Sequence, residues 1–225
     1  MRRLVVLTLA LAIVTGLISG SSSLFAQGEA RLNFGAGVMA GFAASQVHGD
    51  ATAGFNKLGL DLGSFIDVRR SNNFWGIRLE MRYIQKGSRK PANADNGDYT
   101  TWVKHLDYVE IPVLFDLNLG RYQVGAGLYG GRLLRAEENS GGAISDISEN
   151  LRLWDIGGLW YGRMPLSDHA FLQMRMSSSI LSLDKPADGA LPGSQLRSRL
   201  QNIVAQLGVG WNFGVPATVR YELPF

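Results

Sequence analysis

The chain has 225 residues, no cysteine and a formal charge of +3. The absence of cysteine excludes disulfides, thiol chemistry and a lipoprotein acylation site. Two of the 22 basic residues are Arg2 and Arg3; without them 20 basic residues face 19 acidic ones. This small excess predicts no nucleic-acid partner.

Residues 1–26 have the pattern of a secretory signal peptide. Arg2 and Arg3 precede an uncharged apolar stretch, Leu4–Ile18, which is shorter than the roughly 18–20 residues that a membrane-spanning helix needs. We expect cleavage after Ala26, although Leu24 is larger than the residue usually found two positions before the cleaved end. A retained N-terminal anchor is the alternative.

The rest of the chain repeats one unit, in which apolar residues occupy every second position before a polar break. In 32–44, for example, Leu32 and Phe34 alternate with Asn33 and Gly35. A period of two indicates a β-strand with two chemically different faces. The expected strands are 31–46, 57–68, 74–86, 105–119, 122–135, 153–163, 170–181 and 201–213.

The connections between these strands alternate in length. Three are short (69–73, 120–121 and 164–169), whereas 87–104, 136–152 and 182–200 are long and polar, and 47–56 is intermediate. Short periplasmic turns opposite longer outer loops are typical of outer-membrane barrels. Residues 27–213 are therefore predicted to form an all-β fold, an eight-stranded antiparallel up-and-down transmembrane β-barrel with both termini in the periplasm.

One face of the strands carries charges of both signs. Its members are Lys57, Asp61, Asp67, Arg78, Glu80, Arg82, Lys86, Glu110, Asp116, Asp155, Arg163 and Arg175. The interior of an eight-stranded barrel is just wide enough for side chains, and buried charges must pair. We therefore predict a lumen plugged by ion pairs, with Arg78, Glu80, Arg82 and Glu110 as a structural network on two adjacent strands.

The opposite face is apolar, and its aromatic residues gather near the strand ends. We place Phe34, Trp75, Phe115, Tyr122, Trp160, Trp211 and Phe213 toward the periplasmic end, and Phe42, Tyr83 and Trp154 toward the outer end. Two aromatic belts suit a membrane barrel with this face toward lipid. A soluble lipocalin-like barrel, with the apolar face inside, is the alternative.

Two segments resemble a known family. Met81–Arg89 (MRYIQKGSR) ends a strand in Gln-Lys-Gly, and Leu106–Leu114 (LDYVEIPVL) contains Tyr-x-Glu-Ile-Pro. With the leader and the glycine-rich first and last strands, these motifs resemble the PorT-like outer-membrane β-barrel family of Bacteroidetes-type bacteria over nearly the whole mature chain. The resemblance implies an outer-membrane barrel, in some members associated with type IX protein secretion, and no catalytic residues.

The second motif also raises a question of register. Pro112 lies in mid-strand, and apolar residues change from even positions (Leu106, Tyr108) to odd ones (Ile111). A β-bulge over Tyr108–Pro112 would explain both features and would turn Glu110 into the lumen near Arg78 or Arg82. A simple kink with a solvated Glu110 is the alternative.

The last strand contains a pattern read by the outer-membrane insertion machinery, Gln206, Gly208, Trp211 and Phe213. The aromatic residue usually ends the chain, but here residues 214–225 follow, and we interpret them as a periplasmic extension. The final Tyr221–Phe225 fits the pattern less well because Pro224 cannot pair in a sheet.

Evidence for catalysis is weak. Gly125, Gly127 and Gly130 match GxGxxG, but a dinucleotide loop needs a following helix, so we interpret them as lumen-facing glycines. His48, Asp50 and His105 fall near the outer rim and His169 in a periplasmic turn. We expect no metal, no cofactor and no catalytic residue.

The sequence therefore predicts a non-enzymatic structural or interaction protein that acts through its outer loops or as an accessory of protein export. Expected partners are outer-membrane lipid and lipopolysaccharide, the barrel-insertion machinery, and a secretion-system or extracellular protein. A hydrolase or acyltransferase at the outer rim and a narrow channel are the alternatives.

Overall fold

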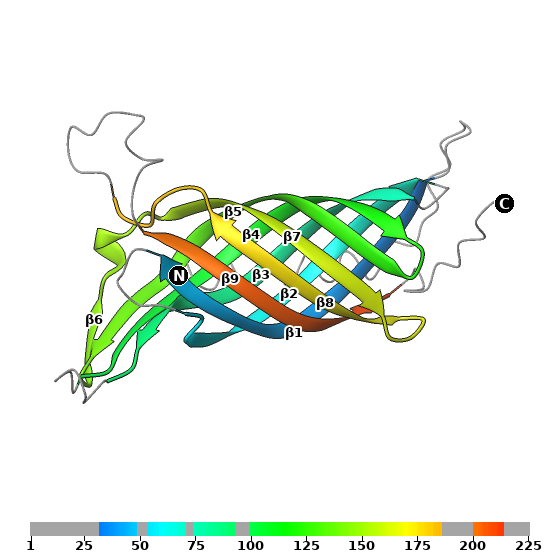
Figure 1. Cartoon of the computed structure of the whole chain (residues 1–225). Coiled ribbons are helices and arrows are strands. Elements are labelled where there is room, and N and C mark those ends of the chain that lie inside the picture. The colour runs from blue at the N-terminus through cyan, green and yellow to red at the C-terminus, as the bar shows by residue number, and fades with distance from the viewer. Residues whose placement is uncertain (1–31, 49–53, 71–73, 93–99, 186–199, 214–225) are drawn as a thin grey trace. The chain divides into compact units, whose positions relative to one another are not determined.

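A computed structural model describes residues 32–48, 54–70, 74–92, 100–185 and 200–213, so the predicted signal peptide and C-terminal extension lie outside it. The described residues form one antiparallel sheet (Figure 1). Its strands are β1 (Leu32–His48), β2 (Lys57–Arg70), β3 (Trp75–Lys90), β4 (Trp102–Leu119), β5 (Tyr122–Ser140), β6 (Ala143–Asp146), β7 (Trp154–Pro165), β8 (Ala170–Ser179) and β9 (Gln201–Asn212), with a 3-10 turn, η2, at Ser148–Asn150.

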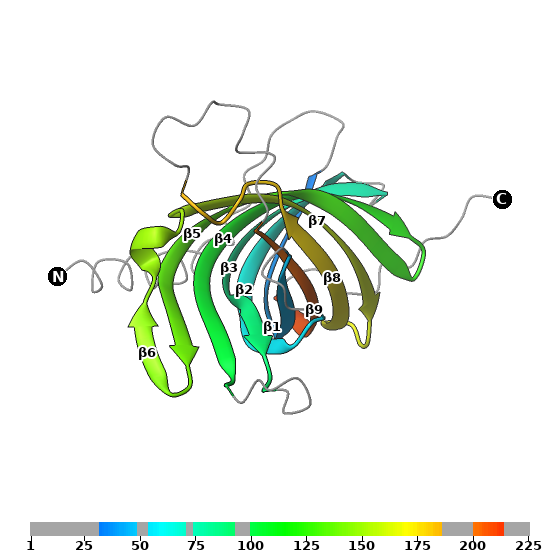
Figure 2. The same ribbon diagram turned by 60° about the vertical axis from the view of Figure 1, so that its left-hand side comes forward.

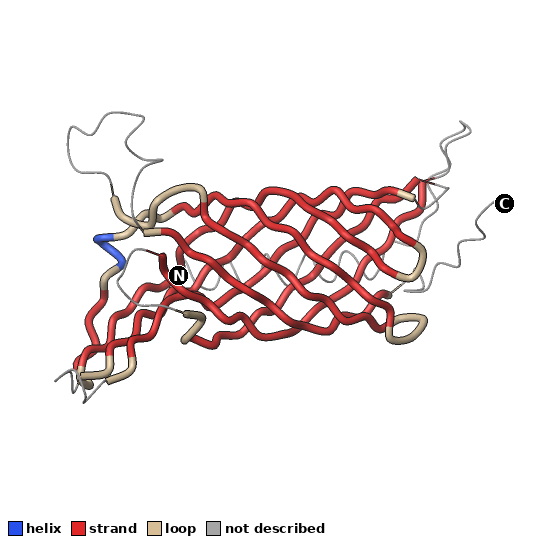
Figure 3. Tube along the Cα trace, viewed as in Figure 1, coloured by secondary structure: helices blue, strands red, loops and turns tan. Residues whose placement is uncertain are grey.

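The sheet closes into a barrel. Each strand pairs with its neighbour in the order β4-β3-β2-β1-β9-β8-β7-β5, and β4 also pairs with β5. Within the described ranges, the ninth strand, β6, pairs only with β5 and is not part of the closed ring. The other eight strands confirm the predicted antiparallel up-and-down barrel (Figure 3). In the described part of the chain, no helix is long and apolar enough to cross a membrane.

The two faces of the barrel wall follow the alternation in the sequence. All twelve predicted lumen charges are buried, and the most exposed of them, Arg163, retains 6% of its accessible surface. The neighbouring positions point outward: Leu79 and Val113, opposite each other on β3 and β4, are 47% and 53% exposed. An apolar exterior around a charged interior contradicts the lipocalin-like alternative.

Large aromatic rings fill much of the lumen, and each of four lies against a glycine on the next strand. The cross-strand pairs are Phe65 with Gly37, Tyr129 with Gly157, Tyr161 with Gly125, and Phe171 with Gly210. A Cβ atom at any of these glycines would come within 2.0–2.5 Å of the ring. Only glycine therefore leaves room for these rings to lie flat along the wall. An aromatic ring packed over a glycine of the next strand in turn offsets the destabilising effect of glycine in a strand.

The expected bulge over Tyr108–Pro112 is wrong in its position. β4 keeps one register against β3 from Trp102 to Leu117. The ladder between β4 and β5 shifts between Asp107 and Tyr108, and the residue passed over, Leu134, belongs to β5. The change of apolar residues from even to odd positions in β4 has another cause. Leu106 and Tyr108 are fully buried and point into the lumen, as Glu110 does, so the strand does not change face.

Strands β3, β4 and β5 continue past the barrel at the end with the long connections. The β2–β3 ladder ends at Asp61 and Ile84, whereas β3 pairs with β4 as far as Lys90 and Trp102. Beyond Arg132, β5 leaves β7 and pairs with β6 instead. The result is a four-stranded projecting sheet (residues 85–90, 102–107, 135–140 and 143–146), which extends past the barrel wall in Figure 2. Much of the expected loop sequence is therefore strand.

Replacing Gly210 by alanine should destabilise the barrel strongly, because the new Cβ would lie 2.0 Å from Cζ of Phe171. We expect a loss on the order of 1–3 kcal/mol, as for other overpacked cores, measured as the unfolding midpoint in detergent. Gly162→Ala is the matched control, since no atom lies within 4 Å of its Cβ position; equal effects of the two changes would contradict the packing described.

Leu79→Arg and Val113→Arg should impair membrane insertion. Both side chains are outward and exposed, and an arginine facing lipid near the bilayer midplane costs about 2–4 kcal/mol in a barrel. The measurement is the amount of heat-modifiable protein in the outer-membrane fraction, with Leu79→Met as control. Normal insertion of both arginine variants would show that this face does not meet lipid.

Candidate functional site

The centre of the lumen is an arginine–carboxylate network around Glu80. This carboxylate accepts hydrogen bonds from Arg175 at 2.7 and 2.8 Å and from Arg82 at 3.2 Å, and Arg78 Nη1 lies 4.0 Å away. Because β3 and β8 lie in different parts of the wall, the Glu80–Arg175 pair crosses the barrel interior. Glu80 thus lies near three cations, and its pair with Arg175 ties facing walls together.

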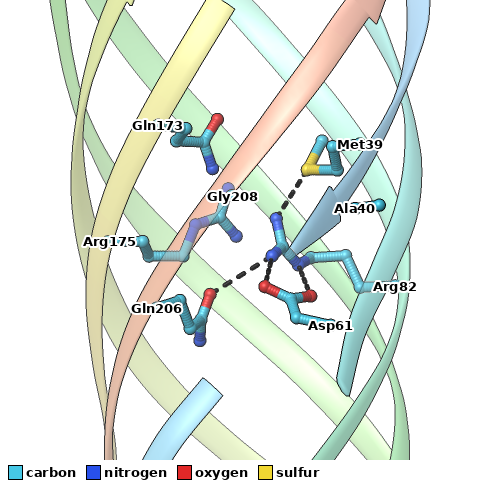
Figure 4. Close-up of a pocket in the computed structure, with 8 residues that line it drawn as sticks. All are labelled: Met39, Ala40, Asp61, Arg82, Gln173, Arg175, Gln206 and Gly208. Carbon is cyan, nitrogen blue, oxygen red and sulfur yellow. Dashed lines mark hydrogen bonds and ion pairs between the residues drawn. The ribbon is translucent and has the colours of Figure 1, made fainter. Parts of the chain in front are cut away.

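Arg82 extends this network to three further strands. It donates to both carboxylate oxygens of Asp61 on β2, to the Gln206 side chain on β9 at 3.2 Å, and it contacts the Met39 sulfur on β1 at 2.8 Å (Figure 4). The cavity among these groups measures only about 10 Å³, roughly the space of one water molecule. The middle of the lumen is therefore filled.

Toward the short turns, the same network continues through two aspartates. Arg78 binds Asp67 with two hydrogen bonds, of 2.5 and 3.0 Å. Asp116 accepts from Arg69 at 3.0 Å and from the Tyr161 hydroxyl at 2.7 Å. Arg163 lies at the edge of this group, 3.9 Å from Asp67.

A separate lysine network lies toward the long connections. Lys86 is completely buried and pairs with Glu110 at 2.5 Å and with Asp155 at 3.0 Å. The rings of Tyr108 and Tyr129 lie 5.0 and 4.7 Å from its ammonium group, within range of cation–π attraction. One lysine is thus held by two carboxylates and two aromatic rings.

The structure brings together three of the four residues predicted as a network. Arg78, Glu80 and Arg82 interact, but Glu110 binds Lys86 and not Arg78 or Arg82. Arg82 and Glu110 do face each other across the β3–β4 ladder. The expectation was wrong because Arg82 turns toward Asp61 while Glu110 turns toward Lys86, four residues beyond Arg82 on β3.

The two family-like motifs meet at this lysine. Lys86 belongs to the Gln-Lys-Gly motif, and Tyr108 and Glu110 belong to the Tyr-x-Glu-Ile-Pro motif on the paired strand. The next residue, Gly87, has a φ of +136° and a Cβ position 2.0 Å from the Lys104 carbonyl oxygen, so only glycine fits. The motifs form the base of the projecting sheet.

An apolar cluster closes the lumen beyond the lysine network, and sequence reasoning missed it. Its buried members are Ala43, Val47, Ile84, Leu106, Tyr108, Leu133, Ala136, Leu151, Leu183 and Val204. Leu151 and Leu183 come from two long connections that are joined by hydrogen bonds, Arg152 N–H to the Leu183 carbonyl and Lys185 N–H to the Asn150 carbonyl. Leu106 and Tyr108, apolar residues at inward positions, could have predicted this cluster, but we interpreted them as the start of a bulge.

The structure places the three histidines on separate parts of the barrel. His105 lies on β4 opposite Gly87 and Glu137, whereas His48 lies on β1 opposite Gln201, and β2 and β3 separate the two strands. His169, in a short turn, stacks on Trp211. Asp50 lies outside the described residues. No three His, Asp or Glu side chains in the described ranges are placed to hold a metal ion.

The GxGxxG segment lies within β5 and is followed by more strand, not by a helix. Gly125 and Gly127 face inward, as expected, against Tyr161 and Leu114. Gly130 is exposed on the outer face with no atom within 4 Å of its Cβ position, so the expectation was wrong for this residue.

The predicted insertion signal spans the end of β9. Gln206 is buried, donates to Ser177 at 3.3 Å and accepts from Arg82, so it belongs to the lumen network. Trp211 and Phe213 point outward and are 50% and 62% exposed, and Gly208 packs against β1 near Gly41. Recognition of these residues by the insertion machinery stays a prediction.

A filled eight-stranded barrel with an apolar exterior is the architecture of small outer-membrane proteins. The model of the family described as "Outer membrane protein beta-barrel domain" matches residues 25–185. The chain belongs to this family. Membership supports an outer-membrane location, and a search of curated proteins finds no match to the chain.

The chain is similar to solved structures of two bacterial surface proteins. Neisserial surface protein A is 12% identical, with a TM-score of 0.51 over 81% of this chain and 99% of its own. Ail, the attachment invasion locus protein of Yersinia pestis, is 14% identical, with a TM-score of 0.44 over 80% of this chain and 98% of its own. At these identities the likeness concerns the fold alone.

Glu110→Gln should lower the unfolding midpoint in detergent more than Glu137→Gln. Glu110 is 2% exposed and neutralises a buried lysine, and loss of one buried partner costs on the order of 3–5 kcal/mol. Glu137 instead binds the exposed Arg135 at 2.6 and 2.7 Å, and exposed ion pairs contribute little to stability. Equal midpoints would contradict the assigned role of Glu110.

Proposed function

We propose that this protein is a non-catalytic interaction protein of the outer membrane, and that its projecting sheet binds the partner. The observation that carries this proposal is the sheet itself, which continues past the barrel and, among the described residues, ends in an open edge at β6. All four residues of β6 are exposed, and Ile144 is 67% exposed. An edge strand offers unpaired backbone groups to an extended segment of another protein.

The surface of this sheet is polar and of mixed charge. Exposed Arg135 binds Glu137, and the carboxylate of Asp146 accepts a 2.8 Å hydrogen bond from the Ser148 backbone N–H. Hydrogen bonds from Ser148 lower the pKa of Asp146 below its usual range, so it remains charged at neutral pH. A charged edge of this kind resists self-association while leaving backbone groups for a specific partner.

The filled lumen disfavours the channel alternative. The arginine network, the lysine network and the apolar cluster follow one another along the interior. His48 on β1 and His105 on β4 are separated by β2 and β3, which disfavours a joint catalytic site at the outer rim. Both observations support a role for the outer surface.

Two further partners accord with this role. Arg132 is exposed on the outer face, 5.9 Å from the Trp154 ring, and can contact phosphate groups of lipopolysaccharide. The PorT-like resemblance is carried by motifs at the base of the projecting sheet, which favours a component of protein export as the protein partner. Loss of exported proteins from the medium of a deletion strain, restored by the parent gene, would test that finer assignment.

The interaction role is tested by affinity capture from outer-membrane extracts with the full protein as bait. Ile144→Lys should reduce recovery of a partner, because it places a charge on the open edge. Leu166→Lys is the matched control, since Leu166 is also exposed (56%) but lies in a short turn at the other end of the barrel. Equal recovery with both variants would exclude β6 as the binding edge.

Planar-bilayer conductance of the parent protein should be near zero, because the lumen networks leave no continuous path. Conductance should appear only when two or more of Arg78, Glu80, Arg82 and Glu110 are shortened together. A steady open pore in the unmodified protein would refute the plugged lumen and support the channel alternative.

A further inference from the structure

The two charged networks of the lumen contain different cations. Among the described residues, the arginine network holds five guanidinium groups, whereas the lysine network has Lys86 as its one cation. Arginine stays protonated in proteins, but the amine of a buried lysine can lose protons and act as a nucleophile. The lysine network therefore contains a reactive type of group that the arginine network lacks.

Two carboxylates converge on this amine from different strands. Lys86 Nζ, on β3, lies 2.5 Å from Oε1 of Glu110 on β4 and 3.0 Å from Oδ2 of Asp155 on β7. In the ladders, Gly131 of β5 stands between Glu110 and Asp155. A Cβ atom at Gly131 would lie 3.1 Å from Cγ of Glu110, so a glycine at this position leaves room for the two carboxylates to meet at one amine.

The environment of these three groups is dry. All are at most 3% exposed, two aromatic rings lie beside the amine, and the apolar cluster closes the lumen beyond them. Oδ1 of Asp155 is buried without a hydrogen-bond partner, whereas Oδ2 accepts from the Tyr129 hydroxyl at 3.3 Å. Burial of a charged amine and a carboxylate carries a large desolvation cost, which a neutral amide formed from the same two groups avoids.

We propose that Lys86 and Asp155 join in an intramolecular isopeptide bond in the folded protein, with Glu110 as the base. Nζ of Lys86 forms a bond to Cγ of Asp155, and the bond from Cγ to Oδ2 breaks. The ammonium group loses two protons, which Glu110 carries to Oδ2, so this oxygen leaves as water and Oδ1 stays as the amide oxygen. One ammonium and one carboxylate thus give one amide and one water, with no change of net charge and no further reactant. The fold favours this step because it holds the reacting groups in contact.

The bond connects β3 to β7 across the two strands between them, at the place where the barrel ends and the projecting sheet begins. Lys86 and Asp155 are 69 residues apart in the chain, and a cross-link over a long segment stabilises a fold by restricting the unfolded chain. The bond forms once and regenerates no free amine, so it is a self-modification and accords with a non-catalytic protein. It does not depend on the binding role proposed for the projecting sheet.

The mass of the full protein purified from the outer membrane decides whether the bond exists. Once its N-terminus has been determined, the parent should be lighter than its sequence by one water molecule. Trypsin should not cleave the denatured parent after Lys86, because the amine is blocked, and the digest should contain a branched peptide that joins Lys86 to Asp155. Neither measurement requires a variant to fold.

Variants test the role of each group. Lys86→Arg keeps the charge but removes the nucleophilic amine, so its mass should equal that of its sequence. Lys57→Arg, a change at another buried lysine, is the matched control and should retain the loss of water. Glu110→Gln keeps both bonding partners and should prevent the bond in the folded fraction, which is identified by its heat-modifiable migration.

A parent mass equal to that of the uncross-linked sequence, or complete cleavage after Lys86, would overturn the proposal. A branched peptide that contains Glu110 in place of Asp155 would overturn it as well, because Glu110 would then be the reacting carboxyl group and not the base. Full formation of the bond in folded Glu110→Gln protein would exclude Glu110 as the base.

Discussion

The narrow interior of an eight-stranded barrel is the constraint on which the rest of this structure depends. The wall can turn only one face outward, and the apolar residues take it, so every inward position must be filled by a side chain that suits a confined and largely dry space. The chain fills it with charged groups in two networks. Because Glu80 binds Arg175 from a distant strand and Arg82 binds groups on β2 and β9, these contacts cross the lumen and hold the walls together.

Glycine provides the space that these large groups need. Phe65, Tyr129, Tyr161 and Phe171 each lie over a glycine of the neighbouring strand, so the rings cover the wall without pushing the strands apart. The rings in turn contact the cations: the Arg163 carbon lies 4.1 Å from the centre of Phe171, and the Lys86 nitrogen 4.7 Å from that of Tyr129. Glycine, aromatic ring and cation therefore act as one packing unit, which explains why the polar face of the strands is also rich in glycine.

The lysine network connects this interior to the outer surface. Lys86, Tyr108 and Glu110 fix β3 against β4 at the place where the barrel ends and the projecting sheet begins. Gly87 follows directly, with a backbone conformation that favours glycine, and accepts a 2.9 Å hydrogen bond from the Ser45 hydroxyl through its carbonyl. A rigid base of this kind positions the exposed edge of the sheet, as expected for a binding surface carried by a stable scaffold.

The sequence by itself determined the eight strands of the closed barrel and the face of nearly every residue in them, but not β6. Both follow from the period of two, which is a local property of the sequence and does not depend on which strands pair. All twelve predicted lumen charges are indeed buried. The tertiary structure decided which charges pair. Arg82 and Glu110 are opposite each other in the ladder, yet Arg82 binds Asp61 on β2 and Glu110 binds Lys86 on β3. It also decided that Leu106, Leu151 and Leu183 form an apolar closure, because residues from distant strands and connections meet only once the sheet has curved into a ring.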